Sequence, residues 1–193
     1  MIALILLGPP AVGKGTQAAM LAEDLDIPTI STGQIFRTNI EEGTELGLLA
    51  EEYMSAGRFV PDSVTVPLIE ARLSAPDTQR GFILDGFPRN LKQAHALRDL
   101  LAKKDITLNA VIELVAPDEI VVTRLQHRAG VENRSDDNVE VFVQRLTDYH
   151  ELTEPIATYY ADQDLLEVVD ADQSIEAVHD AILAILRAKG LCD

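Results

Sequence analysis

The feature that most constrains this chain is a glycine-rich segment near its start, Gly8-Pro9-Pro10-Ala11-Val12-Gly13-Lys14-Gly15-Thr16. It follows an apolar run, residues 2–7, that predicts a buried strand, and it precedes residues 16–25, which predict a helix. In a strand, turn and helix of this kind, the glycines let backbone N–H groups point inward around phosphate oxygens, and the helix N-terminus adds positive potential. The segment therefore predicts a phosphate-binding loop in an α/β protein.

Apolar runs and longer amphipathic stretches alternate along the rest of the chain. Strands are predicted at 2–7, 28–30, 81–84, 110–115 and 165–169, and helices at 16–25, 90–103, 118–128, 139–161 and 174–189. The apolar runs mostly lack strict alternation, which is typical of parallel strands covered on both faces. A chain of 193 residues, 47% of them hydrophobic, can bury one sizeable core. We therefore expect a single α/β domain over residues 1–193, with a doubly wound five-stranded parallel sheet.

Two regions interrupt this alternation. Residues 31 to about 75 hold several short helical patterns and no strand signal, with breaks expected at Gly33, Gly43, Gly47, Gly57 and Pro61. Residues 128–138 are polar and rich in turn formers. We expect residues 31–60 and 128–138 to be mobile segments mounted on a rigid sheet.

Charge and cysteine content narrow the class of protein. The net charge of -16 argues against non-specific nucleic-acid binding and against a basic membrane face. The apolar start has no basic leader and is too short to span a bilayer, so we expect a cytoplasmic protein that does not bind membranes. The only cysteine, Cys192, excludes a disulfide framework and a structural zinc site built on cysteines.

Anionic substrates remain compatible with this acidity. Exposed charges separated by more than about 8 Å are largely screened at physiological salt. An arginine about 4 Å from a phosphate has roughly 4 kcal/mol of raw Coulomb energy at an effective dielectric constant near 20. A few convergent arginines can therefore outweigh a diffuse acidic surface.

Two side chains of the glycine-rich loop suit a nucleotide. Lys14 can reach the β- and γ-phosphates, and a hydroxyl next to such a lysine helps to hold Mg²⁺. Here Gly15 intervenes, so Thr16 comes one place later than in the strict motif and its contact with Mg²⁺ stays open. Taken alone, the loop indicates nucleotide phosphate binding and does not distinguish a kinase from a hydrolase or a switch.

A second polar cluster, Asp85-Gly86-Phe87-Pro88-Arg89, follows the run 81–84. An acidic residue at the carboxyl end of a strand beside a phosphate loop can organise Mg²⁺ through water, although Asp85 could also cap a helix or a turn. Arg89 can aim its guanidinium at a reaction centre, or it can be a surface arginine that begins a helix. Arginine suits phosphoryl transfer because its planar fork pairs with two oxygens and stays charged.

Together these motifs resemble the adenylate kinase family. The resemblance rests on Gly8–Thr16, Ser31-Thr32-Gly33, Arg37, Arg58-Phe59-Val60-Pro61-Asp62, Asp85–Arg89, Arg124, Arg128, Arg134-Ser135-Asp136-Asp137-Asn138 and Arg145, in order and with similar spacing. It covers nearly the whole chain, and residues 128–138 resemble the short lid of the family, without the long lid or its zinc site. It implies Mg²⁺-dependent, reversible, in-line transfer from ATP to AMP, giving two ADP. We expect a monomer, because no long apolar helix face is left without a place in the core.

The resemblance also implies roles for individual residues. The ATP side would comprise Gly8, Ala11, Val12, Gly13, Lys14, Gly15, Thr16, Arg124, Arg128 and the backbone of Gln173. The AMP side would comprise Thr32, Arg37, Arg58, Phe59, Val60, Gly86, Phe87, Pro88, Arg89 and Gln93, with Arg134 and Arg145 closing over the phosphates. The transferring group would be neutralised by Lys14, Arg89, Arg134 and Arg145. Ala11 replaces a glycine that is usual in the family loop, at a cost of about 1 kcal/mol if its φ is positive.

Two other functions stay open. UMP/CMP kinases share Asn90 with this chain, whereas Gln93 and Thr32 are typical of AMP kinases. A glutamine amide can offer a donor and an acceptor together to an adenine edge, which favours AMP. The second alternative is a non-catalytic nucleotide-binding module.

Overall fold

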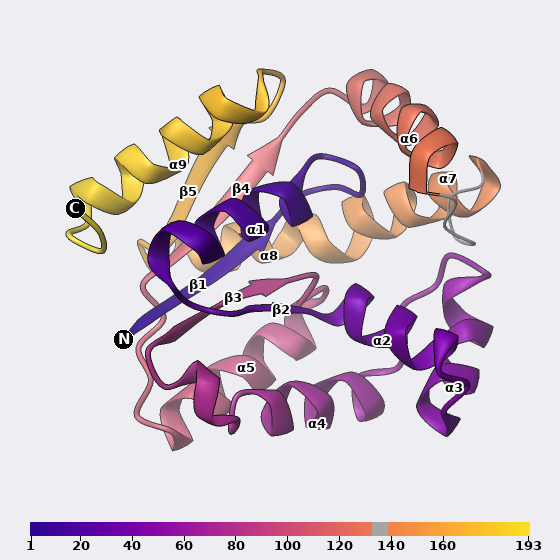
Figure 1. The fold of residues 1–193 in the computed structure, drawn as a ribbon, viewed down its shortest axis with the longest axis horizontal. Coiled ribbons are helices and arrows are strands. Elements are labelled where there is room, and N and C mark those ends of the chain that lie inside the picture. Colours follow the sequence, from indigo (N-terminus) through magenta and orange to yellow (C-terminus); the bar gives the residue numbers. More distant parts are fainter. Residues whose placement is uncertain (133–138) are drawn as a thin grey trace.

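Five parallel strands form one sheet at the centre of the molecule, in the order β2-β3-β1-β4-β5 (Figure 1). The structure is a computed structural model that describes residues 1–132 and 139–193, with side chains for residues 1–127 and 141–193. The strands are β1 (Ile2–Leu7), β2 (Thr29–Ser31), β3 (Gly81–Asp85), β4 (Ala110–Val115) and β5 (Leu166–Asp170). The predicted doubly wound five-stranded parallel sheet is confirmed, and three of its strands differ by one residue from the predicted ends.

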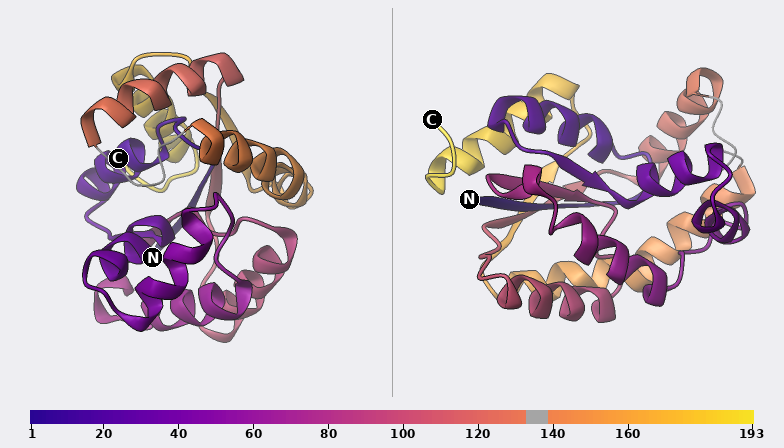
Figure 2. Two further views of the ribbon diagram at one scale, coloured as in Figure 1. Left: turned by 90° about the vertical axis from the view of Figure 1, so that its right-hand side faces the viewer. Right: turned by 60° about the horizontal axis from the view of Figure 1, so that its bottom comes forward.

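Helices cover both faces of the sheet, as the right-hand view of Figure 2 shows. Leu4 and Leu6 of β1 belong to the core on one face, with α1 (Lys14–Leu25), α6 (Asp118–Glu132) and α9 (Ile175–Ala188). Ile5 and Leu7 belong to the core on the other face, with α4 (Asp62–Arg72), α5 (Leu91–Lys103) and α8 (Glu154–Ala161). Successive side chains of a strand point to opposite faces, so an uninterrupted apolar run supplies both cores.

The first part of the segment between β2 and β3 forms a separate helical lobe beyond the carboxyl ends of the strands (Figure 1). It begins with α2 (Thr32–Glu41) and α3 (Glu45–Met54), whose small core contains Phe36, Ala50 and Val60. Breaks occur at Gly43 and Gly57, which have φ of 65° and 70°, but the breaks predicted at two other glycines are wrong.

Those two glycines lie inside helices: Gly33 in α2 and Gly47 in α3. A Cβ on Gly47 would lie 2.0 Å from the carbonyl oxygen of Asn39, so this glycine permits a tight crossing of α2 and α3. Gly47 therefore indicates close packing of two helices and not a turn.

The predicted helix 139–161 is interrupted by a short π-helix. It consists of α7 (Val139–Asp148), a π-helical turn at Tyr149–Thr153 and α8. Pro155 lies in the first turn of α8 and has no N–H to donate, which accounts for the local change in hydrogen bonding. The longest described helix, α6, has 15 residues, and no helix in the described ranges combines the length and apolarity needed to cross a membrane.

The strand order places a topological switch point between β1 and β3. The chain leaves β1 through α1 toward β2 at one edge, and it leaves β3 through α5 toward β4 on the other side of β1. Ligands of open α/β sheets bind at the carboxyl ends of the strands at such a point. The segment 8–16 follows β1 and Asp85 ends β3, so both meet at this crevice.

Candidate functional site

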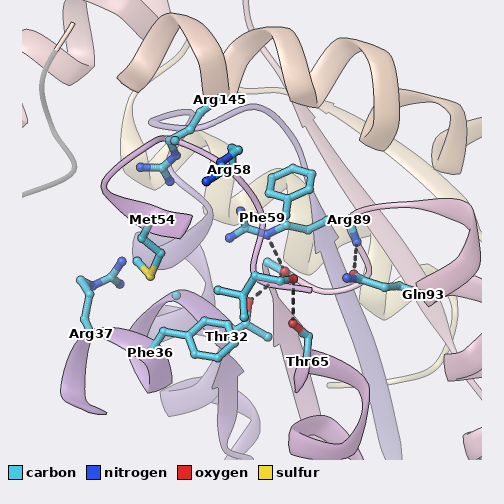
Figure 3. A pocket seen from close by; sticks show the side chains of 14 residues that line it. Thr32, Phe36, Arg37, Met54, Arg58, Phe59, Thr65, Arg89, Gln93 and Arg145 are labelled. Carbon is cyan, nitrogen blue, oxygen red and sulfur yellow. Dashed lines mark hydrogen bonds between the residues drawn. The ribbon is translucent and has the colours of Figure 1, made fainter. Parts of the chain in front are cut away.

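Two adjoining hollows lie at the carboxyl ends of β1 and β3. The larger, which we call the loop cavity, has a volume of about 550 Å³ and is lined by the glycine-rich segment and the end of β3. The smaller, which we call the side pocket, has a volume of about 50 Å³ and is lined by α2, α3 and the segment after β3 (Figure 3). The molecule therefore offers two neighbouring places for ligands.

The glycine-rich loop is held close to the sheet. Gly8 has a φ of 138°, and a Cβ there would lie 2.5 Å from the carbonyl oxygen of Leu114 in β4. Lys14 folds back over the loop, and its Nζ donates to the carbonyl oxygens of Gly8 at 2.7 Å and Pro9 at 2.8 Å. Gly13 precedes α1 without a side-chain cap in the described structure, so the N–H groups of the first turn suit an anion. The strand, glycine-rich turn and helix predicted for this segment are therefore present.

Ala11 adopts the strained conformation that the sequence suggested. Its φ is 62°, in the left-handed region that an alanine enters at a cost of about 1–2 kcal/mol. We predict that Ala11→Gly raises the free energy of unfolding by about 0.5 kcal/mol, because the relief of strain exceeds the entropy that glycine adds to the unfolded chain. Urea titration measures this difference, and a less stable Ala11→Gly protein would contradict the assigned strain.

Asp85 shares the wall of the loop cavity with Thr16. Its Oδ2 accepts a hydrogen bond of 3.1 Å from the Ser31 hydroxyl. Asp85 caps neither neighbouring helix, because Ser31 caps α2 and Asn90 caps α5. The described residues contain no cluster of three His, Cys, Asp or Glu side chains that could hold a metal ion by itself. Mg²⁺ commonly keeps several waters and binds through one or two carboxylates and substrate phosphates, which these oxygen donors suit.

Arg89 is held in place by its neighbours in the side pocket (Figure 3). Its Nε donates to the carbonyl oxygen of Gly86 at 2.7 Å, and its guanidinium carbon lies 4.9 Å from the centre of the Phe59 ring. The backbone is fixed as well, because the hydroxyl of Thr153 donates to the Arg89 carbonyl oxygen at 2.8 Å. Arg89 is therefore a positioned arginine and not a surface residue that merely begins a helix.

Three arginines lie where the two hollows meet. Arg37 of α2, Arg89 and Arg145 of α7 line both the loop cavity and the side pocket. Figure 3 shows all three around one opening, although they come from segments far apart in the sequence. Lys14 lines the loop cavity as well. Three arginines thus gather where the two hollows meet, and the lysine lies in the larger hollow.

Most of the other walls of the side pocket also come from predicted residues. Its lining includes Thr32, Arg37, Arg58, Phe59, Val60, Gly86, Arg89, Gln93 and Arg145. It also includes Gly33, Phe36, Met54, Gly57 and Thr65, which were not predicted as site residues. Thr32 donates to the carbonyl oxygen of Gly86 at 2.9 Å, and Arg58 lies over the Tyr53 ring at 5.2 Å. Pro88 lines the loop cavity instead, whereas Phe87 is fully buried in the core behind the site.

Asn90 has a structural role that the sequence did not reveal. Its side chain accepts the Gln93 N–H at 2.8 Å as the cap of α5, and its Nδ2 donates to Asp62 Oδ1 at 3.0 Å. The residue that this chain shares with UMP/CMP kinases is therefore explained without reference to the base.

The expected ATP side is only partly described. Arg124 lines the loop cavity and joins the loop to the segment after β5, donating to the carbonyl oxygens of Val12 at 3.0 Å and Ala171 at 2.7 Å. The backbone of Gln173 lies beside it, with its carbonyl oxygen 3.5 Å from the same guanidinium. Arg134 and the side chain of Arg128 lie outside the described part of the chain.

Sequence reasoning missed a buried pair beneath the loop cavity. Glu113 of β4 lies opposite Leu7 of β1 in the sheet and accepts a hydrogen bond of 3.2 Å from the hydroxyl of Tyr149, which lines the cavity. Burial raises the pKa of Glu113 above its usual range, and burial followed by the Glu113 charge raises the pKa of Tyr149. A single glutamate inside the apolar run 110–115 was the available signal.

The raised pKa of Glu113 predicts a pH-dependent stability. The folded protein holds this proton more tightly than the unfolded chain, so stability is lost as pH rises from the unfolded pKa of about 4.3 through the folded value. Glu113→Gln keeps an acceptor for Tyr149 and removes the charge. We predict that this variant is more stable than the wild type at pH 8, and that the difference vanishes below about pH 4.

Urea titrations at both pH values measure this difference. Glu23→Gln, which makes the same change in net charge at an exposed position of α1, should show no comparable gain at pH 8. A Glu113→Gln protein less stable than the wild type at pH 8 would show that the ionised carboxylate is favourably held.

Comparisons with known proteins agree on one family. The family model described as adenylate kinase matches residues 6–165. The adenylate kinase of Thermobifida fusca (strain YX) is 47% identical over 186 residues, which are 96% of this chain and 98% of that protein. That of Corynebacterium urealyticum is 46% identical over 183 residues, 95% of this chain and 98% of that protein. The adenylate kinase of Agrobacterium fabrum is 44% identical over 189 residues, which are 95% of this chain and 96% of that protein.

Proposed function

The chain belongs to the adenylate kinase family, and from this we infer how its two hollows divide the substrates. It is a nucleoside monophosphate kinase that converts ATP and AMP reversibly to two ADP. In our proposal ATP lies in the loop cavity, with its phosphates on the loop, and AMP lies in the side pocket. The observation that carries this assignment is that Arg37, Arg89 and Arg145 line both hollows.

The proposed chemistry is direct, in-line transfer without a phosphoenzyme. Phosphoryl transfer requires positioning of the reactants and neutralisation of oxygen charge, and little covalent work from the protein. The attacking atom is a phosphate oxygen of AMP that is already anionic, so no general base is needed. Arg37 and Arg89 would hold the AMP phosphate, while Lys14, Arg89, Arg134 and Arg145 would neutralise the transferring group.

Asp85 and Thr16 are the proposed oxygen donors toward the metal that accompanies ATP. The family uses Mg²⁺ with ATP, and both side chains line the loop cavity. Asp85 would act through water and Thr16 through its hydroxyl. When bound, Mg²⁺ neutralises charge on the donor phosphates.

We propose that substrate binding requires movement of residues 31–60 and closure of residues 128–138. The side pocket holds about 50 Å³, far below the 300–1,000 Å³ that is typical of ligand pockets, so AMP needs more room than it offers. The lobe has its own small core around Phe36, Ala50 and Val60, which would let it move as a unit. Closure would exclude water, because an open site would hydrolyse ATP.

We further propose that the protein works as a cytoplasmic monomer, in keeping with its net charge of -16.

Initial rates with Mg-ATP and AMP, UMP, CMP or GMP test the proposed acceptor. We expect ADP formation to be selective for AMP, because Gln93 lines the side pocket. Selectivity for UMP or CMP would assign the pocket to pyrimidines instead. Nucleotide binding without transfer would point to the non-catalytic alternative and overturn the assignment of the arginines.

A further inference from the structure

The amide of Gln93 is fixed from both sides at the wall of the side pocket. Its Oε1 accepts the backbone N–H of Arg89 at 2.8 Å, and its Nε2 donates to Asp62 Oδ1 at 2.7 Å. Gln93 is only 2% exposed, so these bonds form away from bulk water. Figure 3 shows the amide turned toward the backbone of Arg89.

These two neighbours permit only one orientation of the amide. A backbone N–H can only donate and a carboxylate can only accept, so a rotated amide would place donor against donor and acceptor against acceptor. Asp62 is itself positioned, because Asn90 donates to the same Oδ1 at 3.0 Å and Asp62 begins α4. The orientation therefore follows from the chemistry of the partners.

The Gln93 amide has one donor and one acceptor that these two bonds do not use, and the fixed orientation of the amide also fixes their relative positions. The NH₂ group has two donors and the oxygen has two acceptor positions, and each of the two bonds above uses one of them. Adenine presents an acceptor at N1 beside a donor at its amino group. Hypoxanthine presents the reverse, a donor at N1 beside an acceptor at O6. A freely rotating amide could match either edge, but a fixed amide can match only one.

We propose that Asp62 is a specificity-determining residue, which selects adenine over 6-oxopurines by fixing the orientation of the Gln93 amide. This rests on the proposed function, in which AMP occupies the side pocket and Gln93 contacts its base. Asp62 acts through Gln93, so it is a positioning residue. Its loss should affect the choice between bases more than the rate with AMP.

The test compares kcat/KM for AMP and for IMP, whose bases differ in the order of donor and acceptor. We expect Asp62→Ala to lower the ratio of the AMP value to the IMP value by about tenfold, the effect of about one hydrogen bond. Asp62→Asn keeps an oxygen that accepts from both Asn90 and Gln93, so its ratio should stay within about threefold of the wild type. Asp62→Ser is the second variant if the alanine variant does not fold, because serine favours helix starts. The serine hydroxyl can both donate and accept, so it does not impose one orientation on the Gln93 amide. We expect Asp62→Ser to lower the ratio as alanine does.

Asp77→Ala is the matched control. Asp77 is an acidic residue soon after α4 that pairs with Arg72 on the surface, and it lines neither hollow. Its removal should leave the AMP to IMP ratio unchanged. If Asp62 were merely structural, its variants would lose activity with AMP and IMP alike, and an unchanged ratio would overturn the proposal. A wild-type protein that does not phosphorylate AMP would instead overturn the proposed function, so the two failures are distinguishable.

Discussion

We expect Arg89→Ala to lower kcat for AMP phosphorylation by about 10³, the lower end of the effect of arginines that stabilise transferring phosphoryl groups. The side chain is already held by Gly86 and Phe59 at the junction of the two hollows. Arginine in this position neutralises charge as the phosphoryl group moves, so kcat should fall more than KM rises. Steady-state kinetics with Mg-ATP and AMP measure both parameters.

Arg98→Ala is the control for this variant. Arg98 lies on α5, close to Arg89 in sequence, but it is exposed and pairs with Asp99. Its replacement should leave kcat within about twofold, since exposed ion pairs have small effects. Near-normal turnover by a folded Arg89→Ala protein would remove Arg89 from the proposed mechanism.

The second large effect is expected for Lys14→Met, which should lower kcat by about 10²–10³. Methionine keeps much of the length of lysine and removes the ammonium group, whose Nζ lies 2.7 and 2.8 Å from the loop carbonyl oxygens. In the proposed complex this group stabilises the β- and γ-phosphates of ATP. Lys92→Met, at an exposed position of α5, should leave kcat unchanged.

Because Lys14 also binds the loop itself, stability must be measured beside activity. The midpoint of thermal unfolding with and without ATP separates a disordered loop from a lost phosphate contact. A Lys14→Met protein with a wild-type midpoint and a wild-type kcat would contradict the assigned role of the lysine.

The sequence predicted the sheet well because its signals are local. The run 2–7 is apolar on both faces, which suits a strand covered by helices on both sides. Predictions from local sequence were wrong where a residue is determined by its contact with another helix or strand. Gly47 was interpreted as a helix break because nothing in the sequence indicates that the backbone at Asn39 lies against it.

The composition of the site was also largely predictable, but the connections inside it were not. Most residues expected around AMP line the side pocket, because their motifs follow strands that end at the same edge of the sheet. The bonds from Asn90 and Gln93 to Asp62 join α5 to α4 across the fold, and no local pattern specifies them. The same holds for Glu113 and Tyr149, which are 36 positions apart.

These connections change how single residues are interpreted. Asn90 alone favoured a pyrimidine acceptor, whereas its contacts identify it as a helix cap and a partner of Asp62. Arg124 was expected on the ATP side, and its guanidinium is held by carbonyl oxygens of the loop and of the segment after β5. A residue type at a given position therefore indicates a role only together with its three-dimensional contacts.

The central claim is that ATP and AMP meet end to end between the loop cavity and the side pocket. It is tested most directly by calorimetric titration with one molecule that carries two adenosines joined through five phosphates. We predict one molecule bound per chain, at least about 100-fold more tightly than ATP, because the second adenosine binds as an intramolecular event. An affinity equal to that of ATP, or two molecules bound per chain, would contradict the claim.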